Sequence, residues 1–148
     1  MVKRTKQWEH LQNKKRSESS DAGRLTELHG IFSMNKLAVF SNVTLNNDKF
    51  IHQKRLPDLL WKDGHIQIPI EDDGPIHGNN DELTESKQTR ERNDDYTNAG
   101  FPFIVINREE LKAENIDLET YVKCCRILLS PIIRSMNRIV RYHNGANL

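Results

Sequence analysis

The chain has few of the features that usually identify a function from sequence. Its 148 residues include only two cysteines, Cys124 and Cys125, which are adjacent. Neighbouring side chains on a helix point about 100° apart, so the pair predicts neither a disulfide between them nor, without other ligands, a metal site. No apolar run approaches the roughly 18 residues of a membrane-spanning helix, and there is no signal-peptide pattern. We therefore expect an intracellular protein in a reducing compartment, without a membrane partner.

Catalytic motifs are equally scarce. The six histidines have no partners at the spacings that hold zinc, and the chain has no glycine-rich phosphate loop and no nucleophile motif. Aromatic residues make up 7% of the chain, too few for a sheet that stacks single-stranded bases. The sequence thus predicts no metal, no cofactor, no catalytic residue and no small-molecule substrate, and it favours a binding protein over an enzyme.

One pattern supports an enzymatic alternative. Pro57-Asp58, followed by Glu85-Ser86-Lys87, mimics the arrangement by which a metal-dependent nuclease holds a divalent ion with two acids and orients water with a lysine. That chemistry requires the second acid and the lysine to lie on a rigid strand. Because residues 85–87 fall in a polar stretch that we expect to be a loop, the nuclease is kept only as an alternative hypothesis.

Apolar residues, 36% of the whole chain, are unevenly distributed. They are sparse in residues 1–24, which end in loop-forming residues and are predicted to be a disordered arm. They are also sparse in residues 71–100, predicted to be a long, disordered acidic loop. The remainder has an ordinary globular composition. This predicts a single domain over residues 25–148, interrupted by the loop and small enough to be helped by a partner.

Charge is partitioned along the chain, although the net charge is only +1. Residues 1–24 hold seven basic and three acidic side chains, residues 71–116 hold five and twelve, and residues 118–148 hold five and one. This polarity predicts basic ends that meet an anionic partner. The arm has two basic clusters that resemble a bipartite nuclear-import signal. The arm residues expected to contact phosphate or an acidic partner are Lys3, Arg4, Lys14, Lys15 and Arg16.

Alternating apolar residues predict a small, mainly antiparallel sheet. The four strands that we expect are Lys36–Leu45, Lys49–Gln53, His65–Ile70 and Phe101–Ile106. The first two should form a hairpin with a three-residue turn, and Pro69 should place the third at a sheet edge or end. Residues 25–32 and Leu56–Trp61 have the spacing of short helical turns. Asn107, with Glu110 three residues later, should begin a short helix.

The clearest pattern is a long amphipathic helix over residues 117–143. Asp117 can cap its first turn, and Asn144-Gly145 can stop it. Pro131 removes one internal hydrogen bond and predicts a bend near Ile127–Ser130. Apolar residues recur along it at alternating steps of four and three, a stripe that can cover the sheet and also contact a partner. The stripe residues that we assign to a protein interface are Leu118, Val122, Leu129, Ile132, Met136 and Ile139.

The opposite side of this helix is basic. On a helical wheel five cations fall in one arc, offset only by Glu119. Four of the five are arginine, whose planar guanidinium binds phosphate and carboxylate groups bidentately. The arc therefore favours contact with nucleic acid or an acidic protein. Its residues are Lys123, Arg126, Arg134, Arg138 and Arg141.

Together these patterns predict an α+β domain with a non-catalytic role. The expected fold is a small, mainly antiparallel sheet packed by the long, kinked C-terminal helix, and the alternative is a mostly helical interaction domain. The expected function is that of a small subunit or adaptor in a eukaryotic nuclear complex that acts on chromatin or nucleic acid. It would dock to protein partners through the helix and a sheet edge. The alternatives are a module that binds nucleic acid directly by electrostatics, and the metal-dependent nuclease.

Overall fold

The computed structural model describes residues 23–73 and 82–146, which form an α+β fold. A four-stranded sheet with the order β1-β4-β5-β6 lies at its centre. These strands are Val39–Phe40, Leu59–Asp63, Ile66–Asp72 and Ile104–Ile106. β1, β4 and β5 pair antiparallel, and β6 pairs parallel to β5. The prediction of a small, mainly antiparallel sheet with a long C-terminal helix is confirmed.

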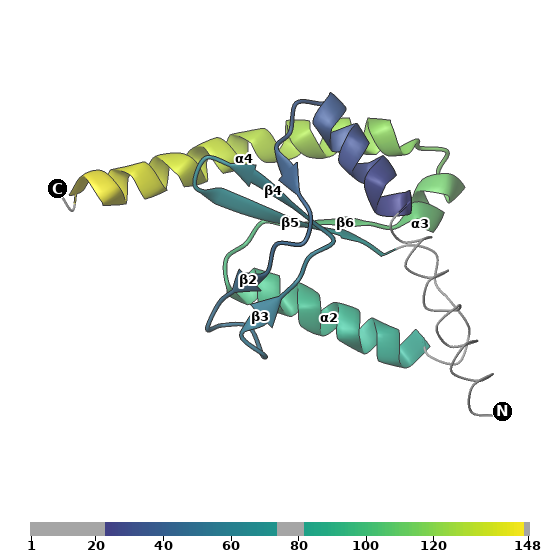
Figure 1. Ribbon diagram of the computed structural model, residues 1–148, viewed down its shortest axis with the longest axis horizontal. Helices are drawn as coiled ribbons and strands as arrows, with labels where there is room; N and C mark the ends of the chain where they lie inside the picture. Colours follow the sequence, from purple (N-terminus) through teal and green to yellow (C-terminus); the bar gives the residue numbers. More distant parts are fainter. Residues whose placement is uncertain (1–22, 74–81, 147–148) are drawn as a thin grey trace, which may run out of the picture.

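Helices cover both faces of the sheet (Figure 1). The helical residues 23–34 and α4 (Leu118–Ala146) lie on one side. α2 (Glu82–Asn98) lies on the other side, together with a two-stranded hairpin of β2 (Leu45–Asn46) and β3 (Lys54–Arg55). α2 is the crossover that allows β6 to run parallel to β5. No helix among the described residues is both long and apolar enough to cross a membrane.

Alternation along β5 divides the core in two. Ile66, Ile68 and Ile70 point to one face, where they join a large apolar cluster that includes Leu28 and Phe32 of the first helix and two residues of α4. The helical spacing predicted for residues 25–32 is thus confirmed. The opposite face of the sheet holds a smaller cluster, which packs against α2 and the β2–β3 hairpin. Its buried members are Leu45, Phe50, Leu60 and Tyr96.

A two-residue turn joins β4 to β5 and is held by α4. Gly64, with a φ of +60°, occupies the first turn position, as in a type II′ turn. The side chain of Asn137 binds the turn on both sides: Oδ1 accepts a hydrogen bond from the N–H of His65 at 2.8 Å, and Nδ2 donates to the carbonyl of Asp63 at 3.0 Å. A Cβ at position 64 would lie 2.5 Å from Oδ1 of Asn137. Glycine is needed here both for its backbone angle and for this close approach.

Several predicted strand boundaries are wrong. Leu56–Trp61 is not a helical turn, because residues 59–63 form strand β4. A short apolar run is compatible with either element, and the Gly64-His65 turn that joins it to the next strand decides between them. The strand predicted over Lys36–Leu45 is interrupted at Asn42, whose φ is +58°, so β1 and β2 are separate.

The predicted first hairpin is also displaced. Lys49–Gln53 is not a strand but most of the turn that separates β2 from β3. Of the strand predicted over Phe101–Ile106, only Ile104–Ile106 pairs with a neighbour. β5 lies inside the sheet, but its pairing with β6 begins at Ile70, so Pro69 stands where β5 has β4 as its single partner. This fits the restriction that proline places on a sheet ladder.

The disordered acidic loop predicted over 71–100 is wrong for the described residues of that range, most of which form α2. The helix ends in a Schellman arrangement: the N–H of Phe101 donates to the carbonyl of Tyr96 at 2.9 Å, and Gly100 has a φ of +79°. Glutamate, lysine, glutamine and arginine are good helix formers without any apolar stripe. Composition alone therefore failed to distinguish this polar helix from a loop.

The predictions for the last two helices hold at their starts. Asn107 and Asp117 each accept a hydrogen bond through Oδ1 from the backbone N–H three residues later, at 3.2 and 2.7 Å. They cap α3 (Arg108–Ala113) and α4. α4 continues through Pro131, where the bend stays a prediction, and past the expected stop to Ala146.

We expect Gly64→Ala to destabilise the fold by about 1 to 3 kcal/mol, because the new Cβ strains the turn and displaces Asn137. Gly30→Ala is the matched control, since it lies in a helix and nothing stands within 4 Å of the added atom. It should be neutral or stabilise by up to about 1 kcal/mol. Urea unfolding followed by circular dichroism measures both, and equal effects would contradict a strained turn at Gly64.

Candidate functional site

Two carboxylates lie together where β4 begins and β5 ends. Leu59 pairs with Ile70, so Asp58 and Glu71 are the next cross-strand pair and share the sheet face that α2 covers. The backbone N–H of Asp58 donates to Oε1 of Glu71 at 3.3 Å. The N–H of Asp72 donates to Oδ2 of Asp58 at 2.8 Å. These bonds hold two like charges close together on adjacent strands.

Glu71 is the buried member of the pair, with 5% of its surface exposed. The hydroxyl of Tyr96 on α2 donates to Oε2 at 2.6 Å, and Nε of Arg92 lies 3.7 Å from the same oxygen. Burial raises the pKa of Glu71 to about 7, although the Tyr96 hydrogen bond and the charge of Arg92 lower it. Burial and the neighbouring Glu71 charge also raise the pKa of Tyr96.

Asp58 is half-buried and borders a second ion pair. Burial raises its pKa, and the charges of Asp72 and Asp73 add to this effect, while the hydrogen bond from Asp72 and the charge of Arg92 oppose it. Arg92 binds Asp73 through two nitrogens, at 2.7 and 3.1 Å. Among the described residues, Oδ1 of Asp58 has no hydrogen-bond partner. This free carboxylate oxygen is available to a ligand.

Two further ion pairs fix the elements around the carboxylates. Asp72 binds Arg108 of α3 at 2.9 Å, and Arg108 also reaches Glu27 of the first helix at 3.3 Å. Asp95 of α2, which is 1% exposed, accepts a hydrogen bond from Nε of Arg55 on β3 at 2.7 Å. α3 and the first helix are thus attached to the end of β5, and the β2–β3 hairpin is attached to α2.

The carboxylates fit a hard divalent cation in part. Among residues 23–73 and 82–146, no group of three or more His, Cys, Asp or Glu side chains is arranged as a metal site. A magnesium-type ion takes only one or two carboxylates from a protein and fills its shell with water and phosphate oxygens. The charges agree, since the ion pairs of Arg92 are with Glu71 and Asp73, and Asp58 has no ion-pair partner among the described residues.

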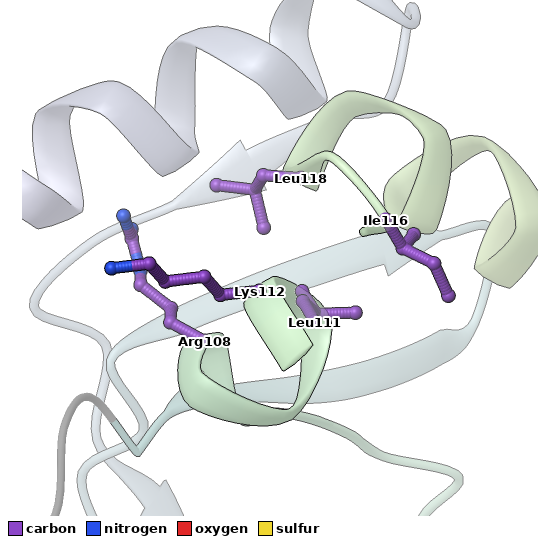
Figure 2. Close-up of a pocket in the computed structure, with 5 residues that line it drawn as sticks. All are labelled: Arg108, Leu111, Lys112, Ile116 and Leu118. Carbon is purple, nitrogen blue, oxygen red and sulfur yellow. The ribbon is translucent and has the colours of Figure 1, made fainter. Parts of the chain in front are cut away.

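A shallow pocket of about 290 Å³ lies elsewhere, between α3 and the start of α4 (Figure 2). Leu111, Ile116 and Leu118 form its apolar wall, and Arg108 and Lys112 extend together on one side. Arg108 is already paired with two carboxylates. The pocket therefore lacks the convergent polar groups of a ligand site.

The cations predicted on α4 are all exposed. Lys123 pairs with Glu119 one turn away, at 3.3 Å. No carboxylate in the described part of the chain pairs with the other four. We call these four the arginine row: Arg126, Arg134, Arg138 and Arg141. The predicted contact residues of the arm lie outside the described residues; they are Lys3, Arg4, Lys14, Lys15 and Arg16.

The predicted apolar interface of α4 needs a correction. Four of its six residues are part of the chain's own core. The sequence pattern detects the main apolar stripe of a helix, and on α4 this stripe covers the sheet. These are Val122, which is fully buried, and Leu118, Leu129 and Met136, which pack against the same cluster. The other two, Ile132 and Ile139, are 51% and 56% exposed.

The pairing of Asp58 with Glu71 was missed from the sequence, which set Asp58 beside Glu85. Glu85 and Lys87 belong to α2, not to a strand. A signal for Glu71 was present in the sequence. Glu71 follows the strictly alternating Ile66–Ile70 strand at a position on the face opposite the isoleucines. Its pairing with Asp58 becomes visible only when β4 is recognised as the partner strand. Arg92 and Tyr96 were missed because their helix was taken for a loop.

Comparison of the chain with protein-family models, curated proteins and solved structures finds no match.

The stability of the cation-free protein should fall as the pH rises from 4.5 to about 7. In this window Glu71 keeps its proton when folded and loses it when unfolded, so the folded state binds more protons and is favoured at the lower pH. The loss is on the order of 3 kcal/mol. Glu71→Gln stays neutral and should lack this dependence. Urea unfolding of both proteins in a chelator across the window measures it, and a pH-independent difference between them would contradict the shifted pKa.

Proposed function

We propose that the protein is a divalent-cation-dependent phosphodiesterase that acts on nucleic acid, with Asp58 and Glu71 as the cation ligands. The observation that carries the proposal is the position of these two carboxylates where β4 begins and β5 ends. The backbone N–H of Asp58 donates to Glu71, and the backbone N–H of Asp72 donates to Asp58. Side chains that hold a catalytic ion must be fixed in this way by rigid elements and surrounding bonds.

The position of Glu71 removes the main objection to a nuclease. The chemistry needs its second acid on a rigid strand, and Glu85 in the sequence pattern does not satisfy this. Glu71 does, because it belongs to β5 and pairs there with Val105 of β6. The preference for a non-catalytic protein came from the scarcity of catalytic motifs in the sequence as a whole. Asp58 keeps the role that the sequence pattern gives it.

The chain's own residues can bind and orient a phosphate group. The free Oδ1 of Asp58 and the carboxylate of Glu71 would hold the cation, whose chemistry is to polarise a phosphate oxygen and lower the pKa of a bound water. Arg92, 3.7 Å from Glu71, supplies a fixed positive charge where the sequence pattern has a lysine. Because this guanidinium already binds Asp73 through two nitrogens, its role would be to hold the acids in place and to offset their charge beside a bound phosphate.

The substrate class is supported by the sequence. Residues 1–24 hold seven basic side chains against three acidic ones, and clustered cations of this kind attract the nucleic-acid backbone. Nuclear localisation and action on chromatin stay predictions, as does direct electrostatic binding of nucleic acid.

We expect the purified chain to cleave DNA or RNA with Mg²⁺ or Mn²⁺ but not in a chelator. Asp58→Asn and Glu71→Gln should each lower the rate at least about a hundredfold, because each removes a charged ligand. The matched control is Asp94→Asn, an exposed carboxylate on α2, which should cleave like the wild type.

Binding of Mn²⁺ gives a second measurement that does not depend on turnover. The ion should raise the melting temperature of the wild type and of Asp94→Asn, but not of Asp58→Asn, because only a folded site that binds the ion is stabilised. If the wild type shows no cation-dependent cleavage, or if Asp58→Asn and Glu71→Gln cleave at the wild-type rate, the proposal is wrong.

A second candidate is the docking function expected of an adaptor. It is favoured by one observation, the large apolar side chains that stay exposed on α4 next to the arginine row. This function does not require the carboxylate pair.

A further inference from the structure

The outer face of α4 carries an apolar strip that no described residue covers. Its four large side chains are between half and three-quarters exposed: Leu128 (72%), Ile132 (51%), Ile139 (56%) and Tyr142 (75%). With the exposed Ser135, the strip follows steps of four, three, four and three. This is the spacing of a seam that contacts one partner helix. Single exposed apolar residues are ordinary, whereas an aligned set of this kind marks an interaction surface.

The strip continues beyond the sheet. Asn137 holds the turn between β4 and β5, and the last part of α4 extends past this turn (Figure 1). Val140 still packs against the core on the inner side of the helix. The helix is therefore anchored along one side while the strip on the other remains open.

Two members of the arginine row, Arg134 and Arg138, lie beside the strip. On a helical wheel Arg138 falls about 40° from Tyr142, and Arg134 about 40° further on. No described carboxylate neutralises these two guanidinium groups. A helix that covers the strip places its own flanking side chains against them. Carboxylates at those positions gain charge-assisted contacts, and cations are repelled.

We propose that this face of α4 binds an acidic amphipathic helix of a partner protein. A second copy of the chain would bring a like-charged arginine row to the seam. Nucleic acid would satisfy the arginines but leave Leu128, Ile132, Ile139 and Tyr142 in water. A membrane surface needs the broad apolar face of a helix, and on α4 the sheet already covers that face.

The test uses a fluorescent peptide about five turns long, with leucine or isoleucine at the four-three spacing and glutamate at the flanking positions. Anisotropy with the full chain should show binding that weakens as salt rises. Ile132→Ser with Ile139→Ser should weaken binding at least about tenfold, because both side chains lie at the centre of the contact. Arg134→Gln with Arg138→Gln should weaken it and remove most of its salt dependence.

Two control variants have the same chemistry elsewhere. Leu56→Ser removes an apolar side chain that is 63% exposed away from α4, and Lys123→Gln removes an exposed cation near the start of α4. Both should bind the peptide like the wild type. Circular dichroism checks that every variant keeps its helical content. Cleavage activity is a separate readout, so this proposal and the phosphodiesterase proposal can fail independently.

Five results would overturn the inference. One is that a peptide in which glutamine replaces every glutamate binds as tightly as the acidic peptide. Another is that the chain sediments as a dimer and that Ile132→Ser abolishes this dimer, because a second copy of the chain would then be the partner that covers the strip. Two more are binding of duplex DNA, or of vesicles rich in anionic lipid, that depends on Ile132 and Ile139. The last is that the wild type does not bind the acidic peptide.

Discussion

Strand β5 is covered by helices on both faces, and the arrangement of the molecule follows from what each face holds. Its isoleucines fill one side, and the alternation places Glu71 on the other, beneath α2. A carboxylate in this position loses most of its hydration, which is costly unless it is hydrogen-bonded. Tyr96, the N–H of Asp58 and nearby Arg92 supply the compensation. Burial of one acid thus fixes the positions of β4 and α2 relative to β5.

The same contacts explain how a segment as polar as α2 joins the fold. Its packing near the C-terminal end is aromatic: the Tyr96 ring lies between 5.4 and 6.4 Å, centroid to centroid, from three phenylalanine rings. Its other attachments are polar, from Arg92 to Asp73 and from Asp95 to Arg55. Pairs of this kind each contribute modestly to stability when both partners are present, and removing one partner of a buried pair costs much more. The helix therefore depends on the acids it covers, and a substitution at Arg92 or Tyr96 changes both fold and site.

The sequence predicted the elements whose patterns are local. The caps at Asn107 and Asp117, the alternating strand before Glu71 and the long terminal helix could all be derived from neighbours along the chain. β4 could not, because a short apolar run takes its conformation from the strand it pairs with. The pairing of Asp58 with Glu71 could not be predicted for the same reason. The two residues are separated by a whole hairpin and come together only through its register, and the hairpin predicted from the sequence is a different one.

The two proposed functions use opposite layers of the molecule. The carboxylates face α2, whereas the strip on α4 lies beyond the other side of the sheet (Figure 1). The β4–β5 hairpin connects them, since Asn137 of α4 holds its turn and Asp58 and Glu71 lie at its far end. A helix bound to α4 would not cover the α2 side of the sheet, where the carboxylates lie. It would also hold the α4 anchor of that hairpin in place. The physical role of such a partner is thus to position the chain near its substrate, because nothing in this arrangement requires the acid pair to move when α4 is occupied.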